Sequence, residues 1–203
     1  MLDLVEAIAA SGIALEHIDF GGGLGIQYQA EEPPRADALW AKLLQKIDAR
    51  GLQNHTLMIE PGRSLVGNAG VCLTEVLFMK PGEQKNFCIV DAAMNDLPRP
   101  AMYQAFHGIV PLVQTAAGAP RLLCDVVGPV CESGDWIGKD RNLAARAGDV
   151  LAVMSAGAYC MSMSSNYNSR PRPAELLVDG ASATLIRPRE QISDLFRDET
   201  LAA

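Results

Sequence analysis

The sequence of 203 residues lacks the features that mark membrane proteins and nucleic-acid-binding proteins. Its longest apolar runs, such as 70–73 and 76–79, are far shorter than the roughly 20 residues of a membrane-spanning helix. Basic residues number 17 against 24 acidic residues, which gives a net charge of −7, and they do not cluster. Because duplex binding depends on Lys and Arg that neutralise phosphates, we expect neither a membrane nor a nucleic-acid partner.

Metal-site and targeting patterns are missing as well. The five cysteines include no CxxC pair, and an odd number favours reduced thiols over a disulfide framework. The three histidines form no ligand set, so no metal is expected. Residues 1–6 are acidic and do not resemble a signal peptide, which predicts a cytoplasmic location. With 49% hydrophobic and 20% charged residues, the chain is typical of globular proteins.

The first third of the sequence alternates helical and strand patterns. Apolar residues at helical spacing predict a helix that ends at Ser11-Gly12 and a second one whose apolar face runs over 39–47, before Gly51. Short apolar runs at 17–20 and 56–59 predict buried strands. This order is typical of a parallel β/α arrangement.

The remainder of the sequence predicts strands without long helices between them. We expect an all-β domain, with the break near 62–68 and units of 1–64 and 65–203. Two strands and two helices cannot close a barrel or cover a parallel sheet, so the first unit is expected to be part of a larger β/α domain. The expected strands lie near Val71–Met79, Asn86–Asp91, Ile109–Gln114, Leu122–Val127, Asp149–Ser155, Glu175–Val178 and Ala183–Ile186.

Two strand ends in the first unit carry residues suited to a ligand. The glycine-rich run 21–25 follows the first strand and gives a phosphate close access to backbone N–H groups, although it also suits a plain tight turn. Glu60-Pro61-Gly62-Arg63 ends the next strand. Glu60 and Arg63 could serve a ligand site there, or they could simply form a local ion pair. Because parallel strands end at a common edge, both segments are expected on one rim.

The second unit has three further groups of interest. Cys131 and Glu132 place a thiol beside a carboxylate in a glycine-bracketed loop, although a lone cysteine is usually a small buried hydrophobe. Arg99 and Tyr103 are four residues apart and could share one face of a helical turn, where both could bind a carboxylate. Tyr159 follows a predicted strand and points either into a site or into the core.

Taken in order, four of these motifs resemble the diaminopimelate decarboxylase family. The resemblance covers essentially the whole chain and corresponds to the C-terminal half of that family. It implies an α/β plus β fold, with the last strands and helices of a TIM (β/α)8 barrel followed by an all-β barrel or sandwich domain. It also implies a homodimeric enzyme that uses pyridoxal 5'-phosphate to decarboxylate meso-diaminopimelate to L-lysine. The four motifs are His17-Ile18-Asp19-Phe20-Gly21-Gly22-Gly23-Leu24-Gly25, Glu60-Pro61-Gly62-Arg63, Cys131-Glu132-Ser133-Gly134-Asp135 and Gly157-Ala158-Tyr159.

The resemblance also implies residue roles. Gly23 and the backbone of the Pro61-Gly62-Arg63 segment would hold the cofactor phosphate, and Glu60 would face the pyridine nitrogen. Arg63, Arg99 and Tyr103 would bind the distal carboxylate of the substrate, and Glu132 its distal ammonium group. Cys131 would reprotonate the α-carbon, and Tyr159 would contact both cofactor and substrate. In the family, the cysteine and glutamate reach the site from the other subunit of the dimer.

One departure from the family concerns lysine. The Schiff-base lysine of the family lies upstream of any segment present here, and none of the five lysines, Lys42, Lys46, Lys80, Lys85 and Lys139, matches it. The chain alone is therefore expected to have little or no activity. Alternatives are an ornithine-, arginine- or carboxynorspermidine-type decarboxylase, a non-catalytic β-domain that serves as a dimerisation or binding module, and an unrelated phosphate-binding fold. Cys131-Glu132 with Arg99 and Tyr103 favours the diaminopimelate type.

Overall fold

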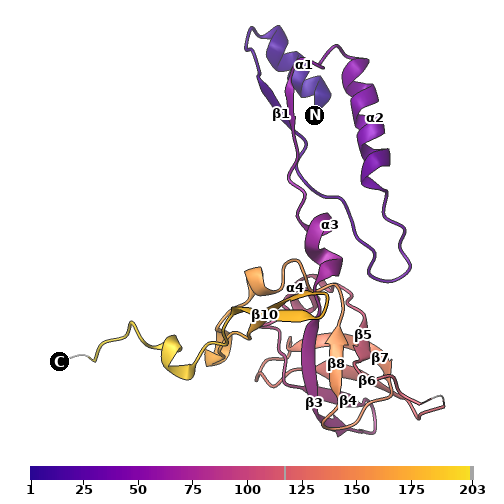
Figure 1. Cartoon of the computed structure of the whole chain (residues 1–203), viewed down its shortest axis with the longest axis vertical. Helices are drawn as coiled ribbons and strands as arrows, with labels where there is room; N and C mark the ends of the chain where they lie inside the picture. The colour runs from indigo at the N-terminus through magenta and orange to yellow at the C-terminus, as the bar shows by residue number, and fades with distance from the viewer. Residues whose placement is uncertain (117, 202–203) are drawn as a thin grey trace. The chain divides into compact units, whose positions relative to one another are not determined.

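Two units, Met1–Asn68 and Ala69–Ala203, make up the chain in a computed structural model that describes residues 1–116 and 118–201 (Figure 1). Helix α3 (Arg63–Val66) lies at the end of the first unit. No helix of the described ranges is long and apolar enough to cross a membrane.

The first unit contains the two helices and the parallel pair of strands that its sequence pattern predicts, and the short helix α3 in addition. Its elements are α1 (Leu2–Ala10), β1 (His17–Asp19), α2 (Ala36–Asp48), β2 (Thr56–Met58), α3 and the 3-10 turn η1 (Gly67–Ala69), which extends one residue past the unit boundary. Strand β1 pairs with β2 in parallel, with Ile18 opposite Leu57. Each strand of this pair therefore has one side that bonds to no other strand among the described residues.

A small core holds the first unit together. Val5 of α1, Ile18 of β1, Ile47 of α2 and Leu52 are buried against one another. The predicted apolar face of α2 is only partly covered, because Leu39 and Leu44 remain exposed while Ile47 is buried. The elements of this unit therefore carry more apolar surface than they bury against one another.

The second unit is built on a six-stranded sheet with the order β5-β8-β3-β4-β6-β7. Four of its five strand pairings are antiparallel, and β4 and β6 are parallel. The edge strands β5 and β7 contact each other, so the sheet is nearly closed into a barrel. The strands of the unit are β3 (Cys72–Lys80), β4 (Phe87–Val90), β5 (Ile109–Pro111), β6 (Leu122–Val127), β7 (Trp136–Leu143), β8 (Val150–Val153), β9 (Glu175–Asp179) and β10 (Ser182–Arg187).

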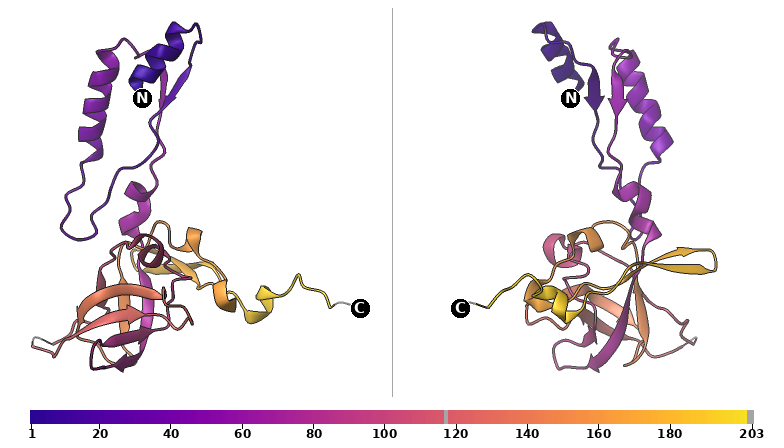
Figure 2. Two further views of the ribbon diagram at one scale, coloured as in Figure 1. Left: turned by 180° about the vertical axis from the view of Figure 1, so that it is seen from behind. Right: turned by 60° about the vertical axis from the view of Figure 1, so that its left-hand side comes forward.

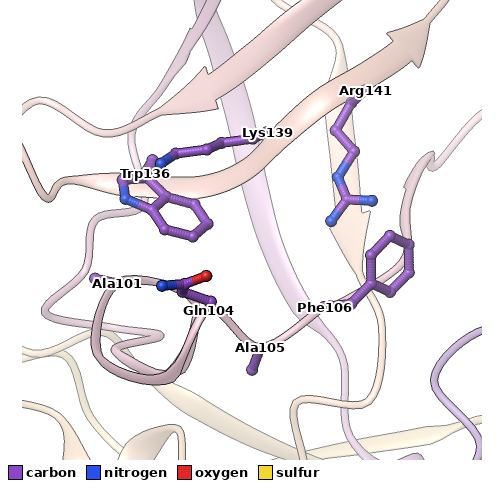
Figure 3. A pocket seen from close by; sticks show the side chains of 7 residues that line it. All are labelled: Ala101, Gln104, Ala105, Phe106, Trp136, Lys139 and Arg141. Carbon is purple, nitrogen blue, oxygen red and sulfur yellow. The ribbon is translucent and has the colours of Figure 1, made fainter.

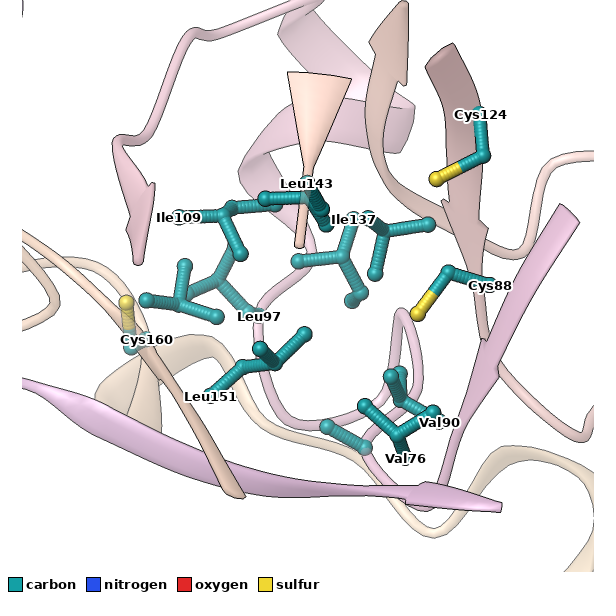
Figure 4. Close-up of a cluster of buried hydrophobic side chains, with 13 residues drawn as sticks. Val76, Cys88, Val90, Leu97, Ile109, Cys124, Ile137, Leu143, Leu151 and Cys160 are labelled. Atoms are coloured by element: carbon teal, nitrogen blue, oxygen red, sulfur yellow. The ribbon is translucent and has the colours of Figure 1, made fainter. Parts of the chain in front are cut away.

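The inside of this barrel is a continuous apolar core (Figure 4). Val76, Val90, Val126, Ile137 and Leu151 are all fully buried in it, and they come from five different strands. In β3 and β4, more and less buried residues alternate along the strand, as expected for strands with one face against a core.

Strand β7 is absent from the sequence-based expectation. Its residues Gly138, Lys139, Asp140 and Asn142 belong to types that are depleted in strands, so local propensity conceals it. The strand forms because pairing with β6 supplies its hydrogen bonds, and the pairing is irregular near Asp140, whose φ is +54°.

The remaining elements are short. Helix α4 (Arg99–Tyr103) contacts β7. Strands β9 and β10 form a hairpin that extends from the barrel as a separate two-stranded ribbon (Figure 2). Three further 3-10 helices occupy Met161–Met163, Tyr167–Ser169 and Ile192–Leu195.

Candidate active site

In the first unit, the glycine-rich segment after β1 lies directly against the segment after β2. The Glu60 N–H donates to the Gly21 carbonyl at 2.8 Å. A Cβ atom at Gly22 would overlap the Glu60 carbonyl oxygen, so this approach requires glycine. Gly23 has a φ of +90° and open space where a side chain would lie. The loop therefore exposes backbone beside the Glu60 carboxylate.

Arg63 follows at the start of α3. The residue is half-buried, and its Nε is a buried atom. Gly62 caps the helix, and its carbonyl accepts the N–H of Leu65 at 3.1 Å. The first N–H groups of any helix have no partner within the helix, so the backbone around Gly62 and Arg63 offers donors next to a guanidinium group.

In the second unit, α4 carries the two residues that were predicted to share a helical turn. Arg99 is buried, with an exposure of 8%, whereas Tyr103 is 61% exposed. The Arg99 guanidinium carbon lies 5.8 Å from the ring centroid of Tyr159, within the range of a cation–π contact. The fold thus brings Arg99 and Tyr159 together, and Tyr103 lies on the same turn as Arg99 with its side chain in solvent.

A histidine that the sequence left without a role supports Arg99. His107 is fully buried, and its Nδ1 lies 2.9 Å from the Met154 carbonyl oxygen. Its Nε2 lies 3.3 Å from Nη1 of Arg99, which can only donate, so Nε2 accepts and Nδ1 carries the proton. Burial lowers the pKa of His107, and the neighbouring Arg99 lowers it further. A neutral imidazole therefore holds the guanidinium in place.

The Cys131-Glu132 segment is shaped by a buried carboxylate at its end. Asp135 is 4% exposed and accepts the N–H groups of Met94 and Val130, both at 2.7 Å. Burial raises the pKa of Asp135, although these hydrogen bonds oppose the shift. Cys131 and Glu132 lie in the exposed part of the loop that Asp135 anchors, as the glycine-bracketed sequence predicted.

Glu132 has a partner that sequence reasoning missed. The Tyr167 hydroxyl donates to Oε2 of Glu132 at 3.2 Å, across 35 residues of sequence. The Gly134 N–H donates to Oε1 at 3.2 Å, and these hydrogen bonds lower the pKa of Glu132. The hydrogen bond to Glu132 raises the pKa of Tyr167. Because 35 residues separate Tyr167 from Glu132, no local pattern in the sequence points to this contact.

The predicted site residues therefore form three local groups. The segments 21–23 and 60–63 lie together in the first unit. Arg99 and Tyr159 form a second group, and Cys131 and Glu132 lie in a third. Within residues 1–116 and 118–201, no three His, Cys, Asp or Glu side chains are arranged to bind a metal ion.

Comparison with known families gives a match over most of the chain. Residues 8–157 match the family described as pyridoxal-dependent decarboxylase, C-terminal sheet domain. This range contains all four motifs except for the end of the last one, since Tyr159 lies two residues beyond it.

Individual relatives agree with this match. A diaminopimelate decarboxylase of Neisseria meningitidis serogroup A is 54% identical over 98% of this chain and 48% of its own length. One of Pseudomonas aeruginosa is 51% identical over 99% of this chain and 47% of its own length. A crystal structure of diaminopimelate decarboxylase from M. jannaschii in co-complex with L-lysine is 37% identical, with a TM-score of 0.88, over 99% of this chain and 46% of that one. The chain spans about half the length of the curated relatives it matches.

Proposed function

The chain belongs to the pyridoxal-dependent decarboxylase family, and we propose that it acts as the C-terminal half of a diaminopimelate decarboxylase. That enzyme would release CO2 from meso-2,6-diaminopimelate and form L-lysine. The observation that carries the proposal is 54% identity to a protein of that name over 98% of this chain. Relatives at 20% identity share the fold alone and do not bear on the substrate.

The residues of the first unit suit pyridoxal 5'-phosphate. Gly23 and the segment Pro61-Gly62-Arg63 would hold its phosphate, because the backbone there is open and the Arg63 guanidinium adds positive charge. Glu60, beside the glycine loop, would keep a proton on the pyridine nitrogen. When bound, the protonated ring supplies a sink for the electrons left by the departing carboxylate.

The residues of the second unit would bind and protonate the substrate. Arg99 and Tyr103, with Arg63, would bind its distal carboxylate, and Tyr159 would contact both substrate and cofactor beside Arg99. Glu132 would accept hydrogen bonds from the distal ammonium group, and its lowered pKa keeps it ionised for that role. Cys131 is exposed next to it and would return a proton to the α-carbon from its thiol.

We further infer that the first unit is the last part of a (β/α)8 barrel and that the functional enzyme is a cytoplasmic homodimer with a shared site. The open sides of the β1–β2 pair support the barrel, since parallel strands are normally paired and covered on both faces. The exposed apolar residues of α2 support it as well. In such a dimer, Cys131 and Glu132 would complete the site of the other subunit.

Complementation tests the proposal. The chain is purified alone and together with the N-terminal half of the Neisseria meningitidis relative, incubated with pyridoxal phosphate, and assayed for CO2 release from meso-diaminopimelate. Borohydride reduction and intact mass then show which polypeptide carries the cofactor. We expect no stoichiometric lysine adduct on this chain, activity only in the mixture, and a loss of kcat of at least 100-fold for Cys131→Ala. The exposed acid Glu83 provides the control, and Glu83→Gln should leave activity unchanged.

Three results would overturn parts of this assignment. Stoichiometric labelling of one of the five lysines would show that this chain carries its own cofactor lysine. An active mixture that prefers ornithine, arginine or carboxynorspermidine would reassign the substrate. A mixture that binds the cofactor but decarboxylates none of these compounds would favour a non-catalytic β-domain.

A further inference from the structure

A pocket beside β7 contains none of the residues assigned above. Its volume is about 590 Å³, and it lies where the end of α4 meets one face of β7 (Figure 3). Two cations, two aromatic rings, one amide and two alanines line it, and no carboxylate of residues 1–116 and 118–201 does. The lining residues are Ala101, Gln104, Ala105, Phe106, Trp136, Lys139 and Arg141.

Each cation of the pocket lies on an aromatic ring. The Lys139 Nζ is 4.1 Å from the ring centroid of Trp136, and the Arg141 Cζ is 3.8 Å from that of Phe106. Figure 3 shows these two pairs on opposite sides of the pocket, with the Gln104 carboxamide on the same side as Trp136 and Lys139. Aromatic support restricts both cations without neutralising their charge.

Neither cation has an acidic partner among the described residues. Asp140 lies between them in sequence, but its carboxylate is 3.9 Å from Lys85, which also forms a 2.7 Å ion pair with Asp125. Other basic residues of this unit, such as Arg170 and Arg172, do pair with acids. The pocket therefore presents two positive charges in a protein whose net charge is −7.

The position of Arg141 lowers the stability of the folded protein. The Arg141 Nε is buried without a hydrogen-bond partner in the described part of the chain, and burial lowers the pKa of Arg141, although the charge of the neighbouring Asp140 opposes this shift. Gly138 makes the position possible, because a Cβ there would lie 2.6 Å from that Nε. A buried guanidinium without an acceptor is destabilising, and a bound anion would remove part of this cost.

We propose that this pocket binds a small dianion, either a dicarboxylate or a phosphate monoester. Lys139 and Arg141 supply two separated positive charges, which favours two anionic groups or one doubly charged group. The Gln104 amide, on the Lys139 side of the pocket, can donate to or accept from a polar atom of the ligand. Ala101 and Ala105 leave room for a short apolar segment of the ligand.

The two tryptophans of the chain, Trp40 and Trp136, allow a direct test. In a Trp40→Phe background of the full chain, Trp136 is the only tryptophan and reports on Lys139. Succinate and inorganic phosphate are titrated separately at constant ionic strength, with chloride as the compensating anion. We expect a saturable change in Trp136 fluorescence with at least one of them. Saturation by only one identifies the anion class.

Variants then localise the binding. Lys139→Gln and Arg141→Gln should each weaken binding at least tenfold, whereas Lys80→Gln, the same change in a lysine of β3, should leave it unchanged. If Arg141→Gln does not fold, as judged by circular dichroism, the Lys139 variant decides. The proposal is overturned if neither anion gives saturation, if Lys139→Gln binds as well as the parent, or if Lys80→Gln weakens binding equally. The last result would indicate a general charge effect.

Discussion

The two units differ in how completely they bury their strands. In Ala69–Ala203, thirteen buried residues form one core inside a nearly closed sheet. In Met1–Asn68, four buried residues hold two helices against a two-stranded parallel sheet. Antiparallel strands joined by short turns can enclose a core within one segment of chain, whereas parallel strands need helices on both faces and further strands on both edges.

This difference indicates where each unit obtains its stability. The second unit contains the partners that its apolar surfaces require. The first has exposed apolar residues on α2 and after β2, including Leu39, Leu44 and Ile59. We therefore expect the second unit to unfold cooperatively and the first to open more readily.

The largest expected effect is in the core of the second unit. Leu151 of β8 is fully buried, and Leu151→Ala should lower the free energy of unfolding by about 3 kcal/mol because it leaves a cavity. Leu123 of β6 is exposed, and Leu123→Ala should cost about 0.5 kcal/mol or less. Hydrogen exchange of the β3 and β8 amides measures the loss of unfolding free energy in each variant. Equal effects would show that the barrel is not the cooperative core.

A substitution in the glycine loop should give the next largest effect. In Gly22→Ala, the new methyl group meets the Glu60 carbonyl, and we expect a loss of about 2 kcal/mol confined to the first unit. Faster exchange of the Glu60 amide, which bonds to Gly21, is the direct readout. The control is Gly25→Ala, whose Cβ makes only an ordinary 3.7 Å contact. Equally fast exchange throughout the second unit would contradict the separation between the units.

A polar network around Glu190 holds the segment after β8, and it should contribute less to the free energy of unfolding. Glu190 accepts hydrogen bonds from the Arg172 backbone at 2.8 Å and from the Asn166 amide at 2.6 Å, and these and its ion pair with Arg172 lower its pKa from 4.5 to about 2. Glu190→Gln should cost about 1–2 kcal/mol at neutral pH.

The pH dependence follows from the direction of that shift. A carboxyl group with a lowered folded-state pKa stabilises the fold fully above its unfolded pKa, near 4.5, and loses this contribution as the pH falls toward about 2. Denaturant unfolding at several pH values should therefore show that the unfolding free energies of the parent and of Glu190→Gln converge as the pH falls between these limits. Glu199→Gln, a matched change near the C-terminal end, should show no such convergence. A difference that stays constant with pH would rule out the network as its source.

The smallest effect concerns the candidate site itself. Removing the Tyr167 hydroxyl takes away a hydrogen bond that lowers the pKa of Glu132, so Tyr167→Phe should raise that pKa toward its ordinary value. Carboxyl-carbon NMR titration detects the shift, and stability should change little because the pair is exposed. Tyr103→Phe, on another exposed tyrosine, serves as the control. An unchanged Glu132 titration would show that the contact is not formed in solution.

Much of the fold was predictable because local patterns are strong. Both helices of the first unit, the parallel pairing of β1 with β2 and the strand near 122–127 follow from apolar spacing and from glycine at the ends of elements. Strand β7 was not predictable, since Gly138 and charged residues weaken its propensity and its pairing partner supplies the stability.

The candidate site divides in the same way. The sequence determined the motifs themselves: a glycine run next to a strand, a glutamate and an arginine after the following strand, and a cysteine beside a glutamate in a loop. Each depends on neighbours within a few residues, where chain connectivity already fixes proximity.

The tertiary structure alone decided which distant side chains meet. Tyr167 reaches Glu132, His107 and Tyr159 contact Arg99, and Lys139 and Arg141 face one pocket. These contacts depend on the strand order β5-β8-β3-β4-β6-β7 and on the irregular pairing of β7. Hydrophobic periodicity shows which face of a strand is buried, but it does not specify which strand lies beside it.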